Sequence, residues 1–358
     1  MFQRITGFAW QARPAALALL LVLSAQPAAI ALSEGAREAI KKSELEQRVL
    51  DVAQMFQNDP RYNRGKTPQQ IKDSVEFVTG NVLFVLGHET AHALISVFGI
   101  PVIGKDEDGA DALATIVALK MGSSFAERVV ANAARGWFLS DQRDRMEGNP
   151  STFYDEHGLD LQRAYNIVCL MVGAAPDKFM ALANEVKLPE ERQSSCRFDY
   201  SNAVWSWEQV LKPHLRKPED LKTIIQVNYA PASEEYTNLQ ELGRRLQILE
   251  SVAAWLSEDY AWTTPISLEM QECGGPDARW LPNEKKVVVC YEMIREFVQL
   301  YRNYGQVALV PGTMKMTKYR KISVAGAKSI KSRAGKAFRA ERKPRQARTP
   351  APRASARF

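Results

Sequence analysis

Residues 81–98 read NVLFVLGHETAHALISVF and predict a helix that is apolar on every side. A helix of this kind is usually buried in the core of a protein. His88, Glu89 and His92 nevertheless lie in its middle. Because a buried carboxylate without a partner costs several kcal/mol, we expect a bound cation to compensate for Glu89 and its neighbours.

The spacing of the two histidines indicates which cation binds. Residues four apart lie on one face of a helix, with Cβ atoms about 5–6 Å apart, so His88 and His92 reach the same metal ion. Glu89 lies about 100° further round the helix, where it can hold a metal-bound water molecule. This is the His-Glu-x-x-His arrangement of zinc peptidases. The chain has only 4 histidines, so a chance match would be rare, and we expect one zinc ion (Zn2+) at this position.

A third protein ligand should come from the acidic segment that follows this helix. A catalytic zinc ion takes three protein ligands and leaves one position open for water. We assign Glu107 as the third ligand. Asp111, one turn further, would accept a hydrogen bond from a ligand imidazole and fix its tautomer. Asp108 and Asp111 remain alternative ligands, because the helix dipole favours acids in a first turn whether or not a metal is bound.

At these residues the chain resembles the zinc peptidases of the zincin type that use a glutamate ligand, through His88-Glu-x-x-His92 and Glu107-x-x-Ala-Asp111. More specifically, it is similar to a bacterial family of uncharacterised zinc metallopeptidases. The resemblance covers roughly residues 40–305, and the zinc motif is its specific part. Softer similarity lies in residues 158–169, in Leu188-Pro189 with Cys196 soon after, and in residues 280–292. The resemblance implies hydrolysis of peptide bonds in a peptide or protein substrate.

The implied mechanism is metal-assisted hydrolysis. Zinc lowers the pKa of its bound water and polarises the peptide carbonyl. Glu89 then acts as general base and passes the proton to the leaving amine. The oxyanion needs a donor, for which Tyr154, His157 and Arg163 are candidates; we take His157 as the catalytic candidate, although a histidine in a polar loop is often only exposed. His214 has no partner pattern and receives no role.

The first 31 residues have the three parts of a secretory signal. Two arginines and no acid precede the apolar run 15–23, and Ala29-Ile-Ala31 fits a cleavage site, so cleavage is expected after Ala31. The run is shorter than the roughly 20 residues that span a bilayer, and no other stretch is expected to be long and apolar enough to cross a membrane. The protein is therefore expected in the periplasm or outside the cell. Export favours disulfides between the sequence-local pairs Cys169–Cys196 and Cys273–Cys290, although 4 cysteines allow three pairings.

Charge divides the chain into an acidic body and a basic tail. From Thr313 to the end there are fifteen lysines and arginines and one acid, Glu341, so this segment carries +14 and the rest −8 of the net charge of +6. The tail, residues 313–358, has few large apolar residues and is predicted to be disordered. It would contact an anionic envelope surface or simply remain solvated. The acidic body and the signal argue against nucleic acid as a partner.

The remaining pattern predicts one peptidase-like domain, residues 33–312, that is mainly α-helical with a small late β element. Its metal site would be of the zincin type, formed by the helix with the two histidines and the acidic helix that follows. Thr67 and Pro68 are expected to start the helix that runs on to Phe98, and Asp106 to cap the acidic helix. The other expected helices are 33–57, 107–121, 125–146, 159–172, 177–186, 238–256 and 290–304, and the expected strands are 266–270, 280–282 and 286–289.

Two further hypotheses remain open from the sequence. The strand 266–270 would either pair with an extended peptide substrate or belong to a hairpin stapled by a disulfide. The alternative to a peptidase is a catalytically inactive zinc-binding protein of the cell envelope. The presence of Glu89 favours the peptidase, because a purely structural zinc site needs no glutamate between the histidines. Such a site also normally has a fourth protein ligand.

Overall fold

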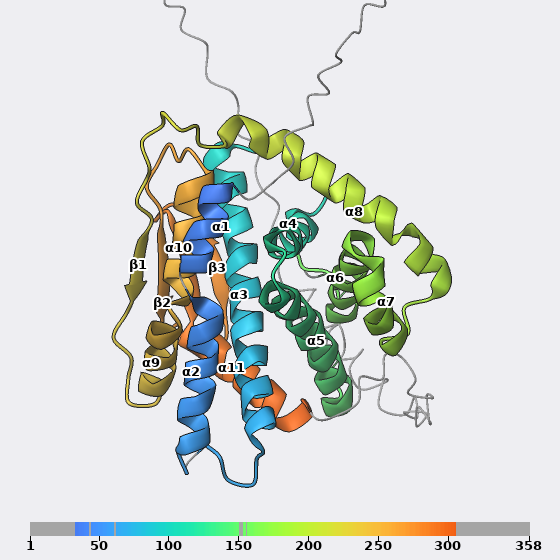
Figure 1. Ribbon diagram of the computed structural model, residues 1–358, viewed down its shortest axis with the longest axis vertical. Coiled ribbons are helices and arrows are strands. Elements are labelled where there is room, and N and C mark those ends of the chain that lie inside the picture. The colour runs from blue at the N-terminus through green and yellow to red at the C-terminus, as the bar shows by residue number, and fades with distance from the viewer. Residues whose placement is uncertain (1–32, 43, 61, 150–152, 155, 306–358) are drawn as a thin grey trace, which may run out of the picture. The chain divides into compact units, whose positions relative to one another are not determined.

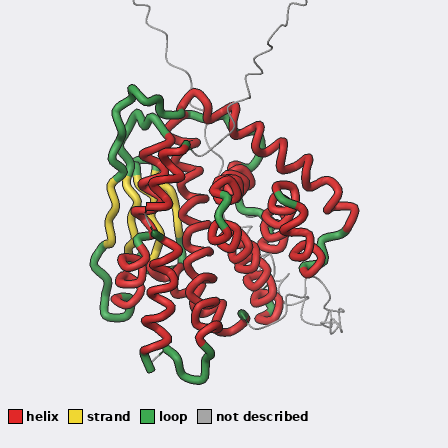
Figure 2. Tube along the Cα trace, viewed as in Figure 1, coloured by secondary structure: helices red, strands yellow, loops and turns green. Residues whose placement is uncertain are grey.

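The computed structural model describes residues 33–305 except 43, 61, 150–152 and 155. The predicted signal (1–31) and basic tail (313–358) lie outside the described residues. The described chain is mainly helical with one small sheet, as predicted (Figures 1 and 2). Its elements are α1 (Glu34–Lys42), α2 (Leu45–Asn58), α3 (Pro68–Phe98), α4 (Asp106–Met121), α5 (Ser124–Glu147), α6 (Asp160–Ala174), α7 (Pro176–Glu185), α8 (Glu190–Leu211), the 3-10 turn η1 (Lys212–His214), β1 (Gln226–Tyr229), α9 (Thr237–Leu246), α10 (Ile248–Asp259), β2 (Ser267–Gln271), β3 (Ala278–Leu281), β4 (Lys286–Cys290) and α11 (Tyr291–Tyr304).

Helix α3 is the central element of the fold. It begins with the expected cap: the Thr67 side chain accepts from the backbone N–H of Gln70, the Gln70 side chain accepts from that of Thr67, and Pro68 takes the first helical position. It ends at Gly99, whose φ of 61° is left-handed. Helices α2, α4, α5 and α11 pack against it, and so do strands β3 and β4. His88 is therefore buried, and His92 is partly buried.

Among the described residues, α3 is also the one helix long and apolar enough to cross a membrane. The expectation that no stretch beyond the signal has this property was wrong. The core helix of a water-soluble protein has the same length and composition, and 56% of the most apolar part of α3 is buried inside the protein. Burial against other helices and the sheet accounts for its apolar sequence.

The sheet has the strand order β1-β2-β4-β3, with β1–β2 and β2–β4 parallel and β3–β4 antiparallel. The three predicted strands are present, and β1 is an addition. Strand β2 is paired on both sides, so the hypothesis that residues 266–270 bind an extended peptide was wrong. The strands at the edges are β1 and β3, and β3 is the one that contacts α3.

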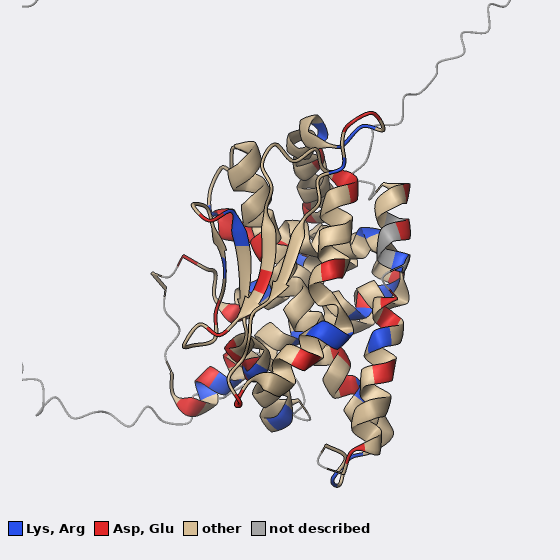
Figure 3. Cartoon of the chain, turned by 90° about the vertical axis from the view of Figure 1, so that its left-hand side faces the viewer, with Lys and Arg blue, Asp and Glu red and all other residues tan. Residues whose placement is uncertain are grey.

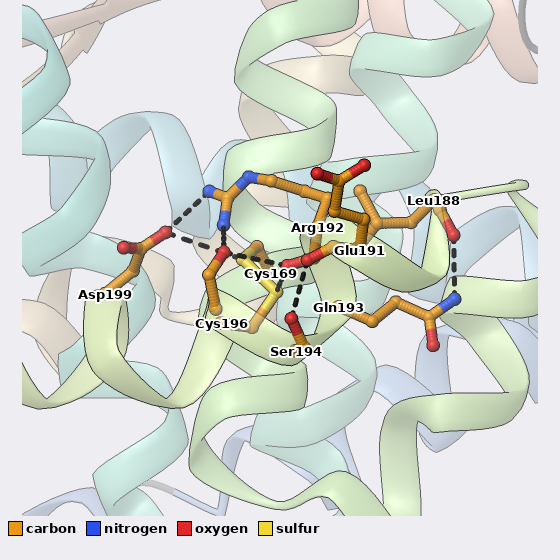
Figure 4. Close-up of a disulfide and its surroundings, with 9 residues drawn as sticks. Cys169, Leu188, Glu191, Arg192, Gln193, Ser194, Cys196 and Asp199 are labelled. Carbon is orange, nitrogen blue, oxygen red and sulfur yellow. Dashed lines mark hydrogen bonds and ion pairs between the residues drawn. A yellow bond between two sulfur atoms is a disulfide. The ribbon is translucent and has the colours of Figure 1, made fainter.

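Both predicted disulfides are confirmed. Cys169–Cys196 joins α6 to α8, and Cys273–Cys290 joins the segment after β2 to the end of β4. Beside the first, Arg192 and Asp199 of α8 form an ion pair of 2.6 Å (Figure 4). The first disulfide thus fixes α6, which packs against α4 and α5, and the second fixes the sheet, which packs against α3.

Two predicted helices are each divided in the structure. The helix expected at 33–57 is α1 and α2, with Glu44 left-handed (φ 50°) between them, and that expected at 238–256 is α9 and α10, with Gln247 left-handed (φ 49°). Neither residue is glycine, so the sequence carries no break signal there. Helix α8 was not predicted, because only three of its residues are buried and it shows no apolar stripe.

Charged residues of both signs are interspersed over the side of the molecule in Figure 3. On the sheet, for example, Lys286 lies 3.5 Å from Glu269 of the neighbouring strand. Binding to a nucleic-acid backbone needs a basic field of one sign, which this side does not present.

Candidate metal centre

Two consecutive helices bring the candidate ligands together. His88 and His92 lie on α3, and Glu107 lies in the first turn of α4, which the intervening loop returns alongside α3. One atom from each of these three side chains lies within 4.8 Å of the other two. Helix α4 begins at Asp106 with Lys105 as its N-cap, so the prediction of Asp106 as the cap was wrong by one residue.

The distances within this group are compatible with one tetrahedral metal ion held by the two imidazoles and by the two oxygens of Glu107, one facing each imidazole. His88 Nε2 lies 3.1 Å from His92 Nε2 and 3.0 Å from Glu107 Oε2, and His92 Nε2 lies 3.4 Å from Glu107 Oε1. Ligand atoms that each bind a tetrahedral ion at about 2.0–2.1 Å are separated from one another by about 3.3 Å. Two imidazole nitrogens and a carboxylate are also a donor set that suits zinc.

The other two acids considered from the sequence lie elsewhere. Asp111 is 7% exposed and its Oδ1 lies 2.8 Å from Nδ1 of His88, the ring nitrogen that faces away from His92. Asp108 lines a small cavity together with Asp111, Asn166 and Asp199, and it does not belong to the group of possible metal ligands around His88. Geometry thus favours Glu107 over Asp108 and Asp111 as the third ligand, and places Asp111 behind His88.

A carboxylate also lies behind His92, which the sequence did not suggest. Asp106 Oδ2 is 3.5 Å from His92 Nδ1. Asp106 is mostly exposed, whereas Asp111 is buried, so the two imidazoles are supported unequally. There was no reason to expect this contact from the sequence, because the helix dipole alone favours an acid such as Asp106 in the first turn of a helix.

Arg163 of α6 binds Asp111 through two hydrogen bonds. Its Nε donates to Oδ2 and its Nη2 to Oδ1, both at 2.7 Å. The guanidinium also lies over the ring of Trp137, 3.8 Å from its centroid. Arg163 had been one of three candidate oxyanion donors; the structure directs it at Asp111 instead.

The ionisable side chains of the site change one another's pKa values. Burial alone would lower the pKa of His88, but hydrogen bonds to Asp111 and Glu107 raise this pKa to about 9. Burial alone would raise the pKa of Glu107, but hydrogen bonds with His157, His88 and His92 hold it well below its usual range. The centre therefore favours positive charge between the imidazoles and Glu107, whether a proton or a metal ion supplies it.

Glu89 lies beside this group and is held from the sheet. It is 8% exposed, and its Oε1 is 4.0 Å from His88 Nε2. Its Oε2 accepts a 2.9 Å hydrogen bond from the backbone N–H of Trp280 in β3. Burial raises the pKa of Glu89, partly offset by the nearby histidines. A carboxyl group with a raised pKa, close to a metal centre, suits a general base.

His157 and Tyr154 come from the segment before α6. His157 Nε2 lies 2.9 Å from Glu107 Oε2, and the side chain is 46% exposed. Tyr154 is 91% exposed and is not among the residues that line the cleft at His88. Of the three candidate oxyanion donors, His157 is thus the one that remains beside the metal group.

The candidate site opens into a cleft of about 480 Å3. Its floor includes His88 and Glu89, and its walls come from α5, the start of α6, β3 and α11. Phe84 also lines a larger apolar cavity of about 720 Å3. No histidine or cysteine lines the larger cavity, so the chemistry favours the smaller one.

A second group of possible ligands, Cys273, Cys290 and Glu292, is occupied in another way. The two sulfurs are joined to each other. Glu292 accepts hydrogen bonds from the backbone N–H groups of Cys273 and Gly274. It therefore stabilises the turn after β2, and the group offers no second metal site.

Comparison with known families supports the chemistry. A family model described as "Putative metallopeptidase" matches residues 44–211 and 229–324, and the chain belongs to this family. Membership implies a metal-dependent enzyme that hydrolyses peptide bonds in peptide or protein substrates. Neither the curated proteins nor the solved structures contain a match.

Proposed function

We propose that this protein is an exported zinc-dependent peptidase with its active site at His88, Glu89, His92 and Glu107. The observation that carries this proposal is the set of 3.0–3.4 Å separations among the ligand atoms of the two histidines and Glu107. These separations, in which Oε2 of Glu107 faces His88 and Oε1 faces His92, support one shared ion, and Glu89 Oε1 lies 4.0 Å from His88 Nε2.

A bound zinc ion would supply Lewis acidity, which polarises a carbonyl and lowers the pKa of a water molecule toward neutrality. His88, His92 and Glu107 would hold it, with Asp111 fixing the His88 tautomer. Glu89 would take the proton of the attacking water at Oε1 while Oε2 stays hydrogen-bonded to β3. Glu89 would then deliver this proton to the leaving amine. His157, which lines the same cleft, would donate to the developing oxyanion.

The substrate would lie as an extended peptide along β3. This strand is an edge of the sheet, lines the cleft through Ala278 and contacts α3. An exposed edge offers backbone hydrogen bonds to a peptide regardless of its side chains. This assignment transfers to β3 the role that the sequence had suggested for residues 266–270.

We further propose that the mature chain acts in the periplasm or outside the cell, after cleavage behind Ala31. The charge pattern and short apolar run of the first 31 residues support export. Two disulfides and no free cysteine among the described residues fit an oxidising compartment. In this setting the basic tail would contact anionic envelope surfaces, and nucleic acid would not be a partner.

One observation favours the alternative, a zinc-binding envelope protein without turnover. His157 Nε2 lies as close to Glu107 (2.9 Å) as His88 does (3.0 Å). If His157 became a fourth ligand, the position needed for water would be closed. The exposure of His157 and its place on a loop favour the open, catalytic arrangement.

The experiment that tests the proposal compares the purified mature chain with Glu89→Gln. Both should contain about one zinc ion, because Glu89 lies outside the ligand set. The wild type should cleave members of a broad peptide library, and the variant should not. Zinc in both with no cleavage by either would support the binding protein, and absence of zinc after chelator-free purification would overturn the site.

A further inference from the structure

We propose that Arg163 is a positioning residue for the metal centre: by clamping Asp111, it fixes His88 in the tautomer and orientation that a metal ligand needs. The inference rests on the proposed function and assigns it a further residue. Arg163 lies 52 residues from Asp111 in sequence and reaches it from α6.

The two charged groups of the clamp, Arg163 and Asp111, are both buried and are hydrogen-bonded to each other. Arg163 and Asp111 are each 7% exposed. Two parallel N–H···O bonds of 2.7 Å fix the plane of the carboxylate relative to the guanidinium. Trp137 supports the guanidinium from one face at 3.8 Å. The carboxylate of Asp111 therefore has one orientation.

That orientation determines which ring nitrogen of His88 carries a proton. Asp111 Oδ1 is the atom that faces Nδ1 of His88, at 2.8 Å, and it also accepts from Arg163. An ionised carboxylate can only accept, so Nδ1 must donate. The lone pair of a neutral His88 then lies on Nε2, the atom 3.0 Å from Glu107 and 3.1 Å from His92.

Arg163 also removes an electrostatic conflict. Asp111 and Glu107 flank the two nitrogens of His88, and both are needed as anions. Asp111 is 7% exposed, and Arg163 is the cation that donates to both of its oxygens, at 2.7 Å each. Without the guanidinium, a buried carboxylate would lose its permanent counter-charge, and an isolated buried charge is strongly destabilising.

The position of Arg163 is set by the fold rather than by its sequence neighbours. Helix α6 packs against α4, α5 and α8, and the Cys169–Cys196 disulfide joins it to α8. A lysine at this position would keep the charge but lose the two-pronged geometry. This difference allows charge and positioning to be separated by experiment.

The test uses Arg163→Lys and Arg163→Met in the full mature chain, with Arg128→Lys as matched control. Arg128 also bridges two carboxylates, Glu46 and Glu76, but lies away from the metal group. Zinc affinity is measured by competition with a chelator, the coordination geometry by the absorption spectrum of the Co2+ form, and kcat and KM at saturating zinc. Partners behind a ligand histidine typically contribute about 10–100-fold to metal affinity.

We expect zinc affinity to fall about 10–100-fold in Arg163→Met and less in Arg163→Lys, with a changed Co2+ spectrum and partial recovery of kcat at high zinc. Arg128→Lys should bind zinc like the wild type. If Arg163→Lys is folded and binds zinc as tightly as the wild type, the inference is wrong; a fall in kcat alone would then make Arg163 a substrate contact. A wild-type chain that binds no zinc would overturn this inference and the proposed function together.

Discussion

Trp280 and Glu89 are joined by a 2.9 Å hydrogen bond from a backbone N–H to a carboxylate, across 191 positions of sequence. The donor belongs to β3, an edge strand, and the acceptor to the central helix. A side chain that must exchange protons while staying in place benefits from such a fixed donor, because the backbone cannot rotate away. The sheet is thus part of the proposed active site, through a backbone group of β3.

Removal of this N–H should reduce turnover without loss of metal. Trp280→Pro deletes the donor at a position whose N–H points away from the ladder, and proline is tolerated on edge strands. A hydrogen bond to a charged group contributes about 1.5–3 kcal/mol, so kcat should fall about 10–100-fold relative to Trp280→Ala. Zinc content should be equal in both variants. Equal activity of the two would mean that the N–H does not position Glu89.

Substitution of His157 should show whether this residue acts in catalysis or occupies a fourth coordination position of the metal. If His157 donates to the oxyanion, His157→Ala should lower kcat about 100-fold, which is the usual loss for one such donor, and leave zinc affinity nearly unchanged. Chelator competition and steady-state kinetics on the same preparation measure the two quantities. A large loss of zinc affinity would instead identify His157 as a fourth ligand and favour the non-catalytic protein.

The sequence predicted the part of this site that is local in the chain. His88, Glu89 and His92 lie within one helical turn and a half, and Glu107 follows after a single loop, so helical periodicity is enough to bring them together. The contacts from Arg163 and Trp280 depend on how α6 and β3 pack, and nothing in their neighbouring residues signals it. Asp106 was predicted only as a helix cap, because an acidic residue is favoured at the start of a helix whether or not it also contacts a histidine such as His92.

The fold shows the same division. Long helices such as α3, which is apolar on every side over residues 81–98, and α5 were predicted to within two residues of their observed ends. The breaks at Glu44 and Gln247 depend on left-handed residues that are not glycine, and tertiary packing imposes them. Strand β1 is four residues long and gains its partner from a segment 41 positions away, at Ser267.

The contact between α6 and α8 should tolerate no side chain at Gly173. A Cβ added there would lie 2.2 Å from the carbonyl oxygen of Cys196, a backbone atom that cannot move aside. Gly173→Ala should therefore lower the free energy of unfolding by about 1–3 kcal/mol, measured by denaturant titration. Gly109→Ala is the control, because its Cβ would meet only Trp207 at 3.6 Å and should stabilise the helix by about 0.5–1 kcal/mol. Destabilisation by both to the same extent would contradict the close-packing explanation.

The two disulfides support different parts of the proposed machinery, and their removal should have different effects. They close loops of 17 and 27 residues, so each pair of serine substitutions should cost about 3 kcal/mol of stability. Loss of Cys273–Cys290 frees the segment that leads into β3 and its donor to Glu89, so kcat should fall while zinc affinity is kept. Loss of Cys169–Cys196 frees α6 and with it Arg163, so zinc affinity should fall first and kcat should recover when zinc is added. Zinc titrations and kinetics on both double variants, well below their melting temperatures, check this contrast.

If both variants lost zinc and activity in parallel, the disulfides would act only through global stability. The explanation that each disulfide separately positions Glu89 or His88 would then be wrong.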